Sequence, residues 1–373
     1  MMHLRTLLLS ALLLWDLAAG ASSGSDGVQL DVLHHVTNAY YLDFTPLGKL
    51  ELPRILIDPE GVHVFPSTTA ALRDGRFIPA EWAEEGAPSG GGGEEAESAR
   101  AGFFGESRAG GPETVEVTHV GKLARRDGLP VYLDLSLTRH GVFMLLAAAL
   151  LLGIFLPLAA RYRAGIGRES APRGPWQNLW ETFIVFIRDE VARPNLGEEH
   201  YRRYLPYLLT AFFFILFCNL LGLVPFGATA TGNITVTAVL ASFTFIITQV
   251  AGTRDYWRHI FWMPGVPVAL RPILTVVEFI GLFTKPFALA IRLFANMTAG
   301  HVAIVCILGL IFIFGGMSPA LGYAVAPFSV AVTLGVYGLE LLVALLQAYI
   351  FTILSAVFIA GALEEHHHEE ETH

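Results

Sequence analysis

The sequence predicts an all-α polytopic membrane protein with about five transmembrane helices and a small β-rich region at its N-terminus. Hydrophobic residues make up 53% of the chain and charged residues only 15%, whereas soluble domains carry about 25% charged residues. Apolar segments long enough to cross a bilayer, which takes about 20 residues, follow one another from residue 139 onward. Before residue 139 some segments alternate between apolar and polar residues, as half-buried strands do.

Residues 1–21 have the pattern of a signal peptide. His3 and Arg5 give a polar start, a short apolar run follows, and "AAGA" supplies small residues for cleavage. The apolar run is short for a membrane span of about 20 residues. This favours a cleaved signal peptide over the alternative, an uncleaved membrane anchor.

Residues 22–138 are predicted to form an extracytoplasmic region rich in β-structure. "LPRILIDPEGVHVF" (52–65) is typical of two strands joined by a turn, and "VYLDLSLT" (131–138) alternates like a half-buried strand. Between them, the segment 86–111 is rich in Gly and Glu and is predicted to be a disordered insert.

Residues 139–362 are predicted to form the membrane domain, and a polar tail follows at 363–373. "WQNLWETFIVFIRDEVA" (176–192) has an apolar stripe opposite polar residues and too many charges to span. We therefore expect an amphipathic helix at the membrane interface. The five expected spans are 141–160, 205–225, 232–252, 268–315 and 320–361.

The arginines predict the orientation of these spans, because short cytoplasmic loops are enriched in Lys and Arg. The 161–203 connection holds eight arginines and the 253–271 connection holds three, whereas the 225–233 and 315–319 connections hold none. We therefore expect the N-terminal region outside the membrane and the C-terminus in the cytoplasm. This charge distribution indicates membrane topology and not binding to nucleic acid.

The last two apolar segments are too long for upright spans. A helix over 268–315 would be about 70 Å long at about 1.5 Å per residue, against a hydrocarbon core of about 30 Å. Two upright spans would need a turn near "FALAIRLFANMTAGH" (287–301), which has no Pro or Gly before Gly300. We therefore predict one long, bent and steeply tilted helix, which forms an oblique hairpin with the equally long segment 320–361.

Few polar residues lie in this hairpin, and they are the candidates for a functional site: Glu278, Lys285, Arg292, Asn296, His301, Glu340 and Gln347. A charge at bilayer depth costs at least about 2.5–3.5 kcal/mol and should face protein or water. Arg292 and Asn296 are one helical turn apart on one face, whereas His301 lies about 180° round the helix from Arg292. This spacing indicates two separate polar routes, with Arg292 near the point that divides them.

Structural roles compete with functional ones at most of these positions. Lys285 can extend its amine toward the membrane surface. Asn296 and Gln347 can hold helices together, and His301 with Glu340 can form a structural pair. Arg292 differs, because arginine keeps its charge at any physiological pH and no acid in the chain is an obvious partner. A partner subunit can supply that acid.

Three segments together resemble the signature of subunit a of the F-type ATP synthase. They are "FCNLLGLVPFGATATGNITVTAVLA" (217–241), "KPFALAIRLFANMTAGH" (285–301) and "ELLVALLQAYIFTILSAVFIAGALEEH" (340–366). The resemblance runs over about 175–365. It implies a non-catalytic, proton-translocating stator subunit of the Fo sector in a bacterial inner membrane. The implied partners are the rotating c-ring, subunit b of the peripheral stalk and the remaining ATP synthase subunits.

The resemblance also implies roles for individual residues. Arg292 matches the family's essential arginine, which pairs with the ion-carrying carboxylate of the c-ring. Glu278 matches an acid of the cytoplasmic half-channel, and the outer half-channel is matched by Asn296, His301, Glu340 and Gln347. Many bacterial members have Glu where His301 stands and His where Glu340 stands. This exchange predicts contact between the two side chains. As further lining of the water path we name Asn219, Thr235, Thr237, Ser242, Thr244 and Lys285.

No cofactor or metal site is predicted. Cys218 and Cys306 lie in apolar runs and are interpreted as small buried hydrophobic residues. The tail "EEHHHEEE" offers three consecutive histidines without the spacing of a helix face, which favours a solvated end over a metal site. The compact members of the family lack a leading region as large as residues 1–138. The resemblance implies no firm role for this region.

Two other functions stay open on the sequence. One is a self-contained secondary transporter with a substrate site near the bilayer midplane, although no inverted repeat or matched pair of broken helices supports it. The other is a membrane scaffold whose Arg292 only holds a partner. Proton flux with the c-ring present separates all three.

Overall fold

The computed structural model describes residues 39–43, 49–80, 122–125, 127, 129–165, 174–224, 227–262, 267 and 270–363. These residues fall into two compact units divided near residue 142, each described by itself below. The predicted signal peptide, the 86–111 insert and the polar tail from residue 364 lie outside the described residues.

The N-terminal unit contains a three-stranded antiparallel sheet. Strand β3 (Arg54–Asp58) pairs with β4 (Gly61–Phe65) on one side and with β7 (Leu133–Asp134) on the other. The β3–β4 pairing confirms the hairpin predicted within 52–65. β7 confirms a strand within 131–138, although it is only two residues long.

The other elements of this unit were not foreseen. They are β1 (Tyr41–Asp43), β2 (Lys49–Glu51), β5 (Phe77–Pro79), β6 (Leu123–Arg125) and the short helix α3 (Thr68–Arg73). β1 pairs with β2 and β5 with β6. The core consists of Leu56, Ala71, Leu72, Phe77 and Leu123, so one face of β3 packs against α3 and the β5–β6 pair.

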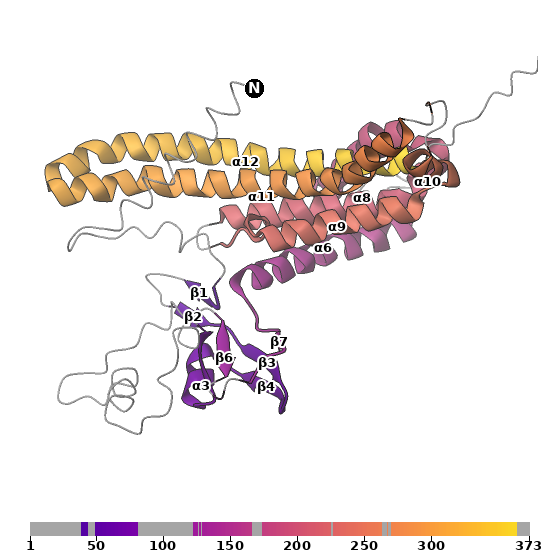
Figure 1. The fold of residues 1–373 in the computed structure, drawn as a ribbon. Helices are drawn as coiled ribbons and strands as arrows, with labels where there is room; N and C mark the ends of the chain where they lie inside the picture. The colour runs from indigo at the N-terminus through magenta and orange to yellow at the C-terminus, as the bar shows by residue number, and fades with distance from the viewer. Residues whose placement is uncertain are drawn as a thin grey trace, which may run out of the picture. The chain divides into compact units, whose positions relative to one another are not determined.

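The membrane unit is helical throughout its described length (Figure 1). Its elements are α6 (Arg139–Arg163), α7 (Pro175–Phe186), the π-helix η2 (Ile187–Ala192), α8 (Arg193–Leu223), the 3₁₀ turn η3 (Ala230–Gly232), α9 (Ile234–Ala251), α10 (Arg254–Phe261), α11 (Arg271–Met317) and α12 (Pro319–Leu363). Five helical segments among the described residues are long and apolar enough to cross a membrane. The predicted fold class is therefore confirmed.

Two boundaries differ from the sequence prediction. The expected helix 176–192 corresponds to α7 and η2, but the helical run that begins at Pro175 continues into the first residues of α8 and ends at a kink at Gly197. The backbone of Gly197 is non-helical, with φ 70°, a conformation that glycine adopts without steric cost. The connection 253–271 contains α10, which begins after Thr253, whose hydroxyl accepts a hydrogen bond from the backbone N–H of Tyr256 at 3.2 Å.

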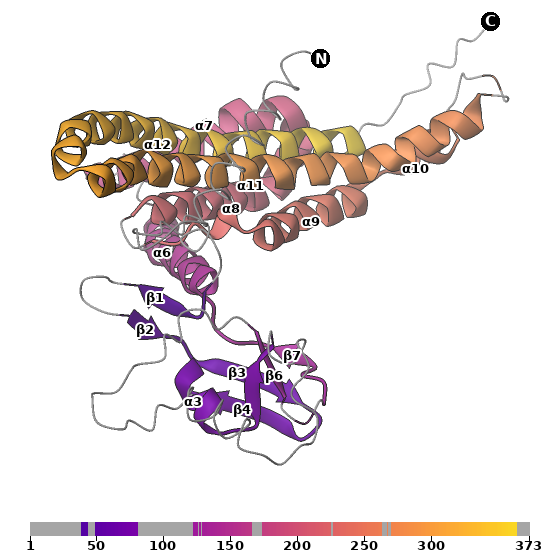
Figure 2. The same cartoon turned by 60° about the vertical axis from the view of Figure 1, so that its left-hand side comes forward.

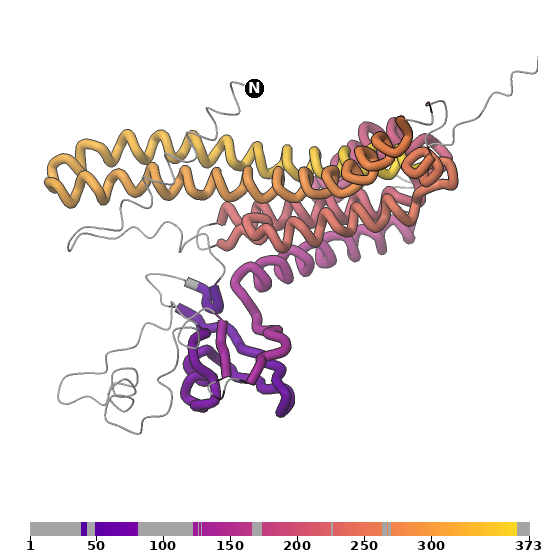
Figure 3. Tube along the Cα trace, viewed as in Figure 1, coloured from indigo at the N-terminus to yellow at the C-terminus, as the bar shows by residue number. Residues whose placement is uncertain are grey.

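The predicted long hairpin is present. α11 has 47 residues and α12 has 45, and the two run side by side in opposite directions (Figures 1 and 2). Figure 3 shows the chain reversing once between them, as two unbroken helices. At about 1.5 Å per residue each is about 70 Å long, more than twice the hydrocarbon core. Their tilt in a bilayer stays a prediction.

α8 supplies the centre of the membrane unit's core. Leu208, Ile215 and Cys218 are fully buried on it, and the Phe213 ring lies 4.5 Å from the Phe155 ring of α6, centroid to centroid. α8 also packs along α12, while α9 packs along α11. The candidate site lies where α8 and α9 pack against the hairpin of α11 and α12.

Candidate functional site

Arg292 lies on an exposed face of α11. Ala288, Ala295, Asn296 and Ala299 are exposed on the same side of the helix, at spacings of three to seven residues from Arg292. Among the residues that the structure describes, Arg292 forms no ion pair. The cation is therefore presented outward between small side chains, and small side chains let another helix approach closely.

His301 and Glu340 are brought together, as their exchanged positions predict. His301 Nδ1 lies 3.1 Å from Glu340 Oε1, and the Glu340 side chain is only 2% exposed. Gly300 leaves the room for this contact, because a Cβ there would lie 2.7 Å from Glu340 Oε1. The second carboxylate oxygen, Oε2, has no hydrogen-bond partner among the described residues. It is placed to accept a proton or a water molecule.

The connection between α8 and α9 extends this pair. Thr229 Oγ1 lies 3.2 Å from His301 Nε2, and the hydroxyl of Thr231 donates to Asn219 Oδ1 at 2.7 Å. Asn219 in turn donates to the carbonyl of Ala344 at 3.1 Å. We call Asn219, Thr229, Thr231, His301 and Glu340 the outer cluster. Sequence reasoning missed Thr229 and Thr231, for which the only signal was their position in "GATATGN", between two spans.

Gln347 and Asn296 take different positions relative to the outer cluster. Gln347 is 5% exposed and lies one helical turn beyond Ala344, whose carbonyl Asn219 contacts. Asn296 is exposed on the face of Arg292. Gln347 is therefore a buried neighbour of the outer cluster, whereas Asn296 belongs to the exposed face of Arg292.

A second polar site lies toward the other end of α9. A pocket of about 300 Å³ is lined by five polar side chains among apolar ones, namely Thr244, Thr248, Gln249, Tyr256 and Lys285. We call this pocket the inner pocket. Leu282, Lys285 and Pro286 form its α11 wall, so it ends about 10 Å along the helix axis from Arg292. Thr248, Gln249 and Tyr256 are further residues that sequence reasoning missed.

A chain of buried hydroxyls continues from the inner pocket into the core. The Tyr207 and Thr244 hydroxyls lie 2.6 Å apart, and Thr244 lies 3.2 Å from Ser355. Ser355 donates to the backbone carbonyl of Phe351 at 2.8 Å. These hydrogen bonds join α8, α9 and α12 to one another beside the pocket.

Three predicted lining residues belong to neither polar site. Thr235 and Ser242 are exposed, and the Ser242 hydroxyl donates to the carbonyl of Ala238 on its own helix. Thr237 is buried and donates to the carbonyl of Ile234. Cys218 is buried as predicted and Cys306 partly buried.

Glu278 lies one helical turn before Leu282 and seven residues before Lys285, on the same side of α11. Its charge acts on Tyr256 of α10. Burial raises the pKa of Tyr256, the hydrogen bond with Gln249 lowers it, and the negative charge of Glu278 raises it. Glu278 is therefore close to the Tyr256 side of the inner pocket.

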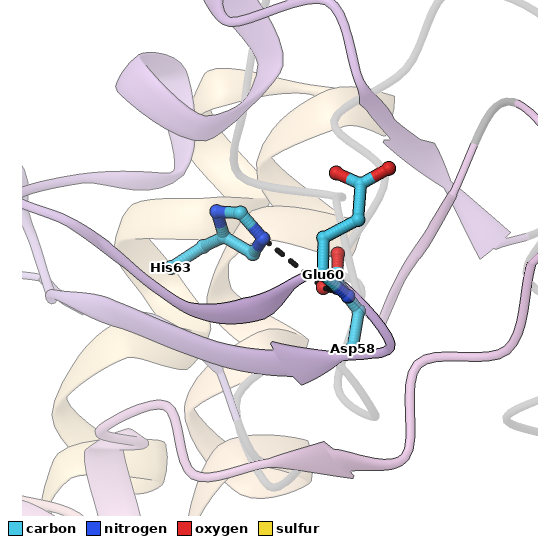
Figure 4. A group of neighbouring side chains, drawn as sticks. All are labelled: Asp58, Glu60 and His63. Carbon is cyan, nitrogen blue, oxygen red and sulfur yellow. Dashed lines mark hydrogen bonds and ion pairs between the residues drawn. The ribbon is translucent and has the colours of Figure 1, made fainter.

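In the N-terminal unit, one cluster has the composition of a metal site. Single ligand atoms of Asp58, Glu60 and His63 lie within 4.8 Å of one another, and Figure 4 shows His63 pointing at the Asp58 carboxylate. Arg125 already occupies the cluster, with its guanidinium 2.6 Å from Asp58 and 2.8 Å from Glu60. Asp58 Oδ1 also accepts bonds from the N–H groups of Glu60 and Gly61. The cluster is therefore an ion-pair network, because its carboxylates already bind Arg125 and backbone N–H groups.

Comparison with known proteins places these sites in a family. The sequence model of the ATP synthase A chain matches residues 141–360. A protein of Chloroherpeton thalassium named ATP synthase subunit a is 51% identical over 245 residues, which is 64% of this chain and 70% of the relative. Its namesake in Myxococcus xanthus is 49% identical over 65% of this chain and 78% of its own length. That of Chlorobium phaeobacteroides strain DSM 266 is 48% identical over 62% and 67%.

Proposed function

This chain belongs to the ATP synthase A chain family, and from this premise we propose that it is the proton-conducting stator subunit of a bacterial Fo sector. It carries no catalytic site for ATP of its own in this proposal. It forms two half-channels in the membrane, and Arg292 faces the carboxylate of a rotating c-ring between them.

The observation that carries the proposal is the outward, unpaired cation of α11. A permanent charge at bilayer depth needs a partner, and the described part of the chain gives Arg292 none. The exposed alanines around Arg292 suit close approach by another helix. A c-ring helix that presents a carboxylate supplies both the packing partner and the missing charge.

The chemistry follows from the charge. An Arg beside a carboxylate favours its ionised form, so a protonated ring carboxylate that reaches Arg292 releases its proton. The fixed cation also repels any proton that would pass directly between the two half-channels. Each proton that crosses is worth about 2.3 kcal/mol per 100 mV, which rotation of the ring captures.

The two polar sites support two separate routes. In the outer half-channel, His301 and Glu340 pass a proton across their 3.1 Å contact, in which an imidazolium and a carboxylate become an imidazole and a carboxylic acid, and back. On the other side, the inner pocket and Glu278 form the cytoplasmic half-channel. The arginine-rich connections support a cytoplasmic location for that side, because short cytoplasmic loops are enriched in Lys and Arg. Subunit b and the remaining synthase subunits complete the assembly.

ATP-driven proton pumping by the assembled synthase in proteoliposomes tests this function. We expect Arg292→Ala to abolish pumping while assembly is retained, because no other cation takes its place. Pumping at the wild-type rate in Arg292→Ala would contradict the proposal and favour a scaffold. Uptake of a substrate by the isolated chain, without the c-ring, would favour a transporter.

A further inference from the structure

One polar side chain of the inner pocket comes from outside the membrane-length helices. α10 contributes Tyr256, whereas α9 contributes Thr244, Thr248 and Gln249. α10 packs against both α11 and α12. It therefore forms one wall of the pocket beside these two long helices.

Several contacts fix α10 in this position. The backbone N–H of Thr253 donates to the carbonyl of Ala362 on α12 at 3.0 Å. Gly252 leaves room for the Tyr256 ring, because a Cβ at position 252 would lie 2.6 Å from Tyr256 Cδ1. Ile260, on the inner side of the same short helix, is 3% exposed. These contacts fix the backbone of α10, which keeps the Tyr256 side chain in the wall of the pocket.

The phenol oxygen of Tyr256 faces an amide that can both donate and accept. Gln249 Nε2 lies 3.4 Å from Tyr256 Oη, and Gln249 Oε1 lies 3.5 Å from it. A phenol is donor and acceptor at once, so it can take a proton on one side while it gives one on the other. The negative charge of Glu278 acts on this phenol, so the acid is close to it.

We propose that Tyr256 relays protons between the inner pocket and the cytoplasmic end of the half-channel. In each passage a protonated water of the pocket gives its extra proton to the phenol oxygen as the phenol proton leaves to Glu278 or to water beside it, so Tyr256 and the pocket water are neutral again afterwards. The neighbouring amine of Lys285 repels metal cations from the same pocket, whereas a proton passes by exchange along hydrogen bonds. The inference rests on the proposed function, because it needs protons to move through this pocket.

The test measures passive proton conduction through the complete Fo sector in proteoliposomes. We expect Tyr256→Phe, which keeps the ring and its packing, to lower the conduction rate roughly tenfold. This is less than the 10²–10⁴ of a positioned proton-transfer group, because water carries part of the flux. Tyr256→His, which restores a group that both donates and accepts, should recover most of the rate. Tyr323→Phe is the matched control, since Tyr323 is 81% exposed on α12 and should leave conduction unchanged.

Conduction at the wild-type rate in Tyr256→Phe would overturn the relay. An equal loss in Tyr256→Phe and Tyr256→His would also overturn it, because packing alone would then explain the effect. Arg292→Ala, assayed in parallel for ATP-driven pumping, tests the proposed function separately. Loss of pumping there with normal conduction in Tyr256→Phe would leave the function standing and remove only the relay.

Discussion

Arg54 of the N-terminal unit and Arg292 of the membrane unit solve the same electrostatic problem in opposite ways. Arg54 is fully buried, with its guanidinium 3.3 Å from the centroid of the Tyr40 ring. Its Nε donates to Thr68 at 3.0 Å, and Asp134 lies 3.8 Å away. Arg292 is exposed and, within the described residues, forms no ion pair. The comparison teaches that a structural arginine is satisfied inside its own unit, whereas Arg292 is directed toward a partner.

The sharpest test of this comparison is Arg292→Lys. Lysine keeps a positive charge but loses the rigid, delocalised fork and can give up its proton. We expect ATP-driven pumping to fall by a factor on the order of 100 or more, with no change in the thermal stability of the purified chain. Normal pumping would mean that charge alone suffices and that the fork geometry is unimportant.

The His301–Glu340 contact gives the next largest effect. We expect His301→Ala or Glu340→Gln to lower pumping by roughly 10- to 100-fold, because each removes one half of a proton-exchanging pair. The double variant with His301→Glu and Glu340→His should pump better than either single exchange, because it keeps both groups in contact. A double variant no better than the single ones would show that the order of the two residues matters.

Replacement of Arg54, the structural arginine, should lower the stability of its unit, in contrast to replacement of Arg292. Removing one partner of a buried pair costs about 3–5 kcal/mol, so Arg54→Met should unfold the N-terminal unit at lower denaturant concentration. Proteolysis of the full chain in detergent measures this change, with Arg73→Met, on the exposed end of α3, as a control. Equal protease resistance in the two variants would contradict the structural role of Arg54.

The smallest expected effect is a pH dependence of the N-terminal unit. Burial alone would raise the pKa of Asp58, but hydrogen bonds from Arg125, His63 and two backbone N–H groups outweigh it and lower the pKa to about 2. A carboxylate with a depressed pKa stabilises the fold above its unfolded pKa of about 3.9. That contribution is lost as the pH falls through about 2.

Acid unfolding between pH about 4 and about 2 checks this effect, followed by protease sensitivity of the N-terminal unit. We expect Asp58→Asn to weaken the unit near neutral pH and to flatten its dependence on pH in that window. An unchanged acid profile in Asp58→Asn would assign the acid sensitivity to other carboxylates.

The predictable part of the site follows from local patterns. The excess length of the 268–315 and 320–361 segments predicted two long helices without a turn near Arg292, and α11 and α12 confirm it. The exchange of His and Glu predicted their contact. The extension of the 176–192 helix as far as the kink at Gly197 was not predicted, because Pro194 is a local stop signal. The fold accommodates Pro194 near the start of α8, and the helical backbone is interrupted at Gly197, at a positive φ.

The polar walls of the two sites could not be predicted in the same way. Thr229 and Thr231 lie in a short connection whose path depends on how α8, α11 and α12 pack. Thr235 and Ser242 were predicted to line the water path from their residue type alone. In the structure they lie on the exposed side of α9, whereas Thr244 and Thr248 lie on its buried side. Hydroxyl residues carry little periodic signal of their own, so only the packing partners of α9 select which of them face the site.

The sequence by itself determined the membrane class, the lengths of the helices, the family resemblance and the singular position of Arg292. These follow from local hydropathy and from the cost of a permanent charge in an apolar run, which depend on near neighbours in the chain. Only the tertiary structure decided which other polar groups meet, such as Thr231 with Asn219 and Tyr256 with Gln249. A hydrogen bond depends on distances of about 3 Å between side chains, and helix rotation and packing set those distances.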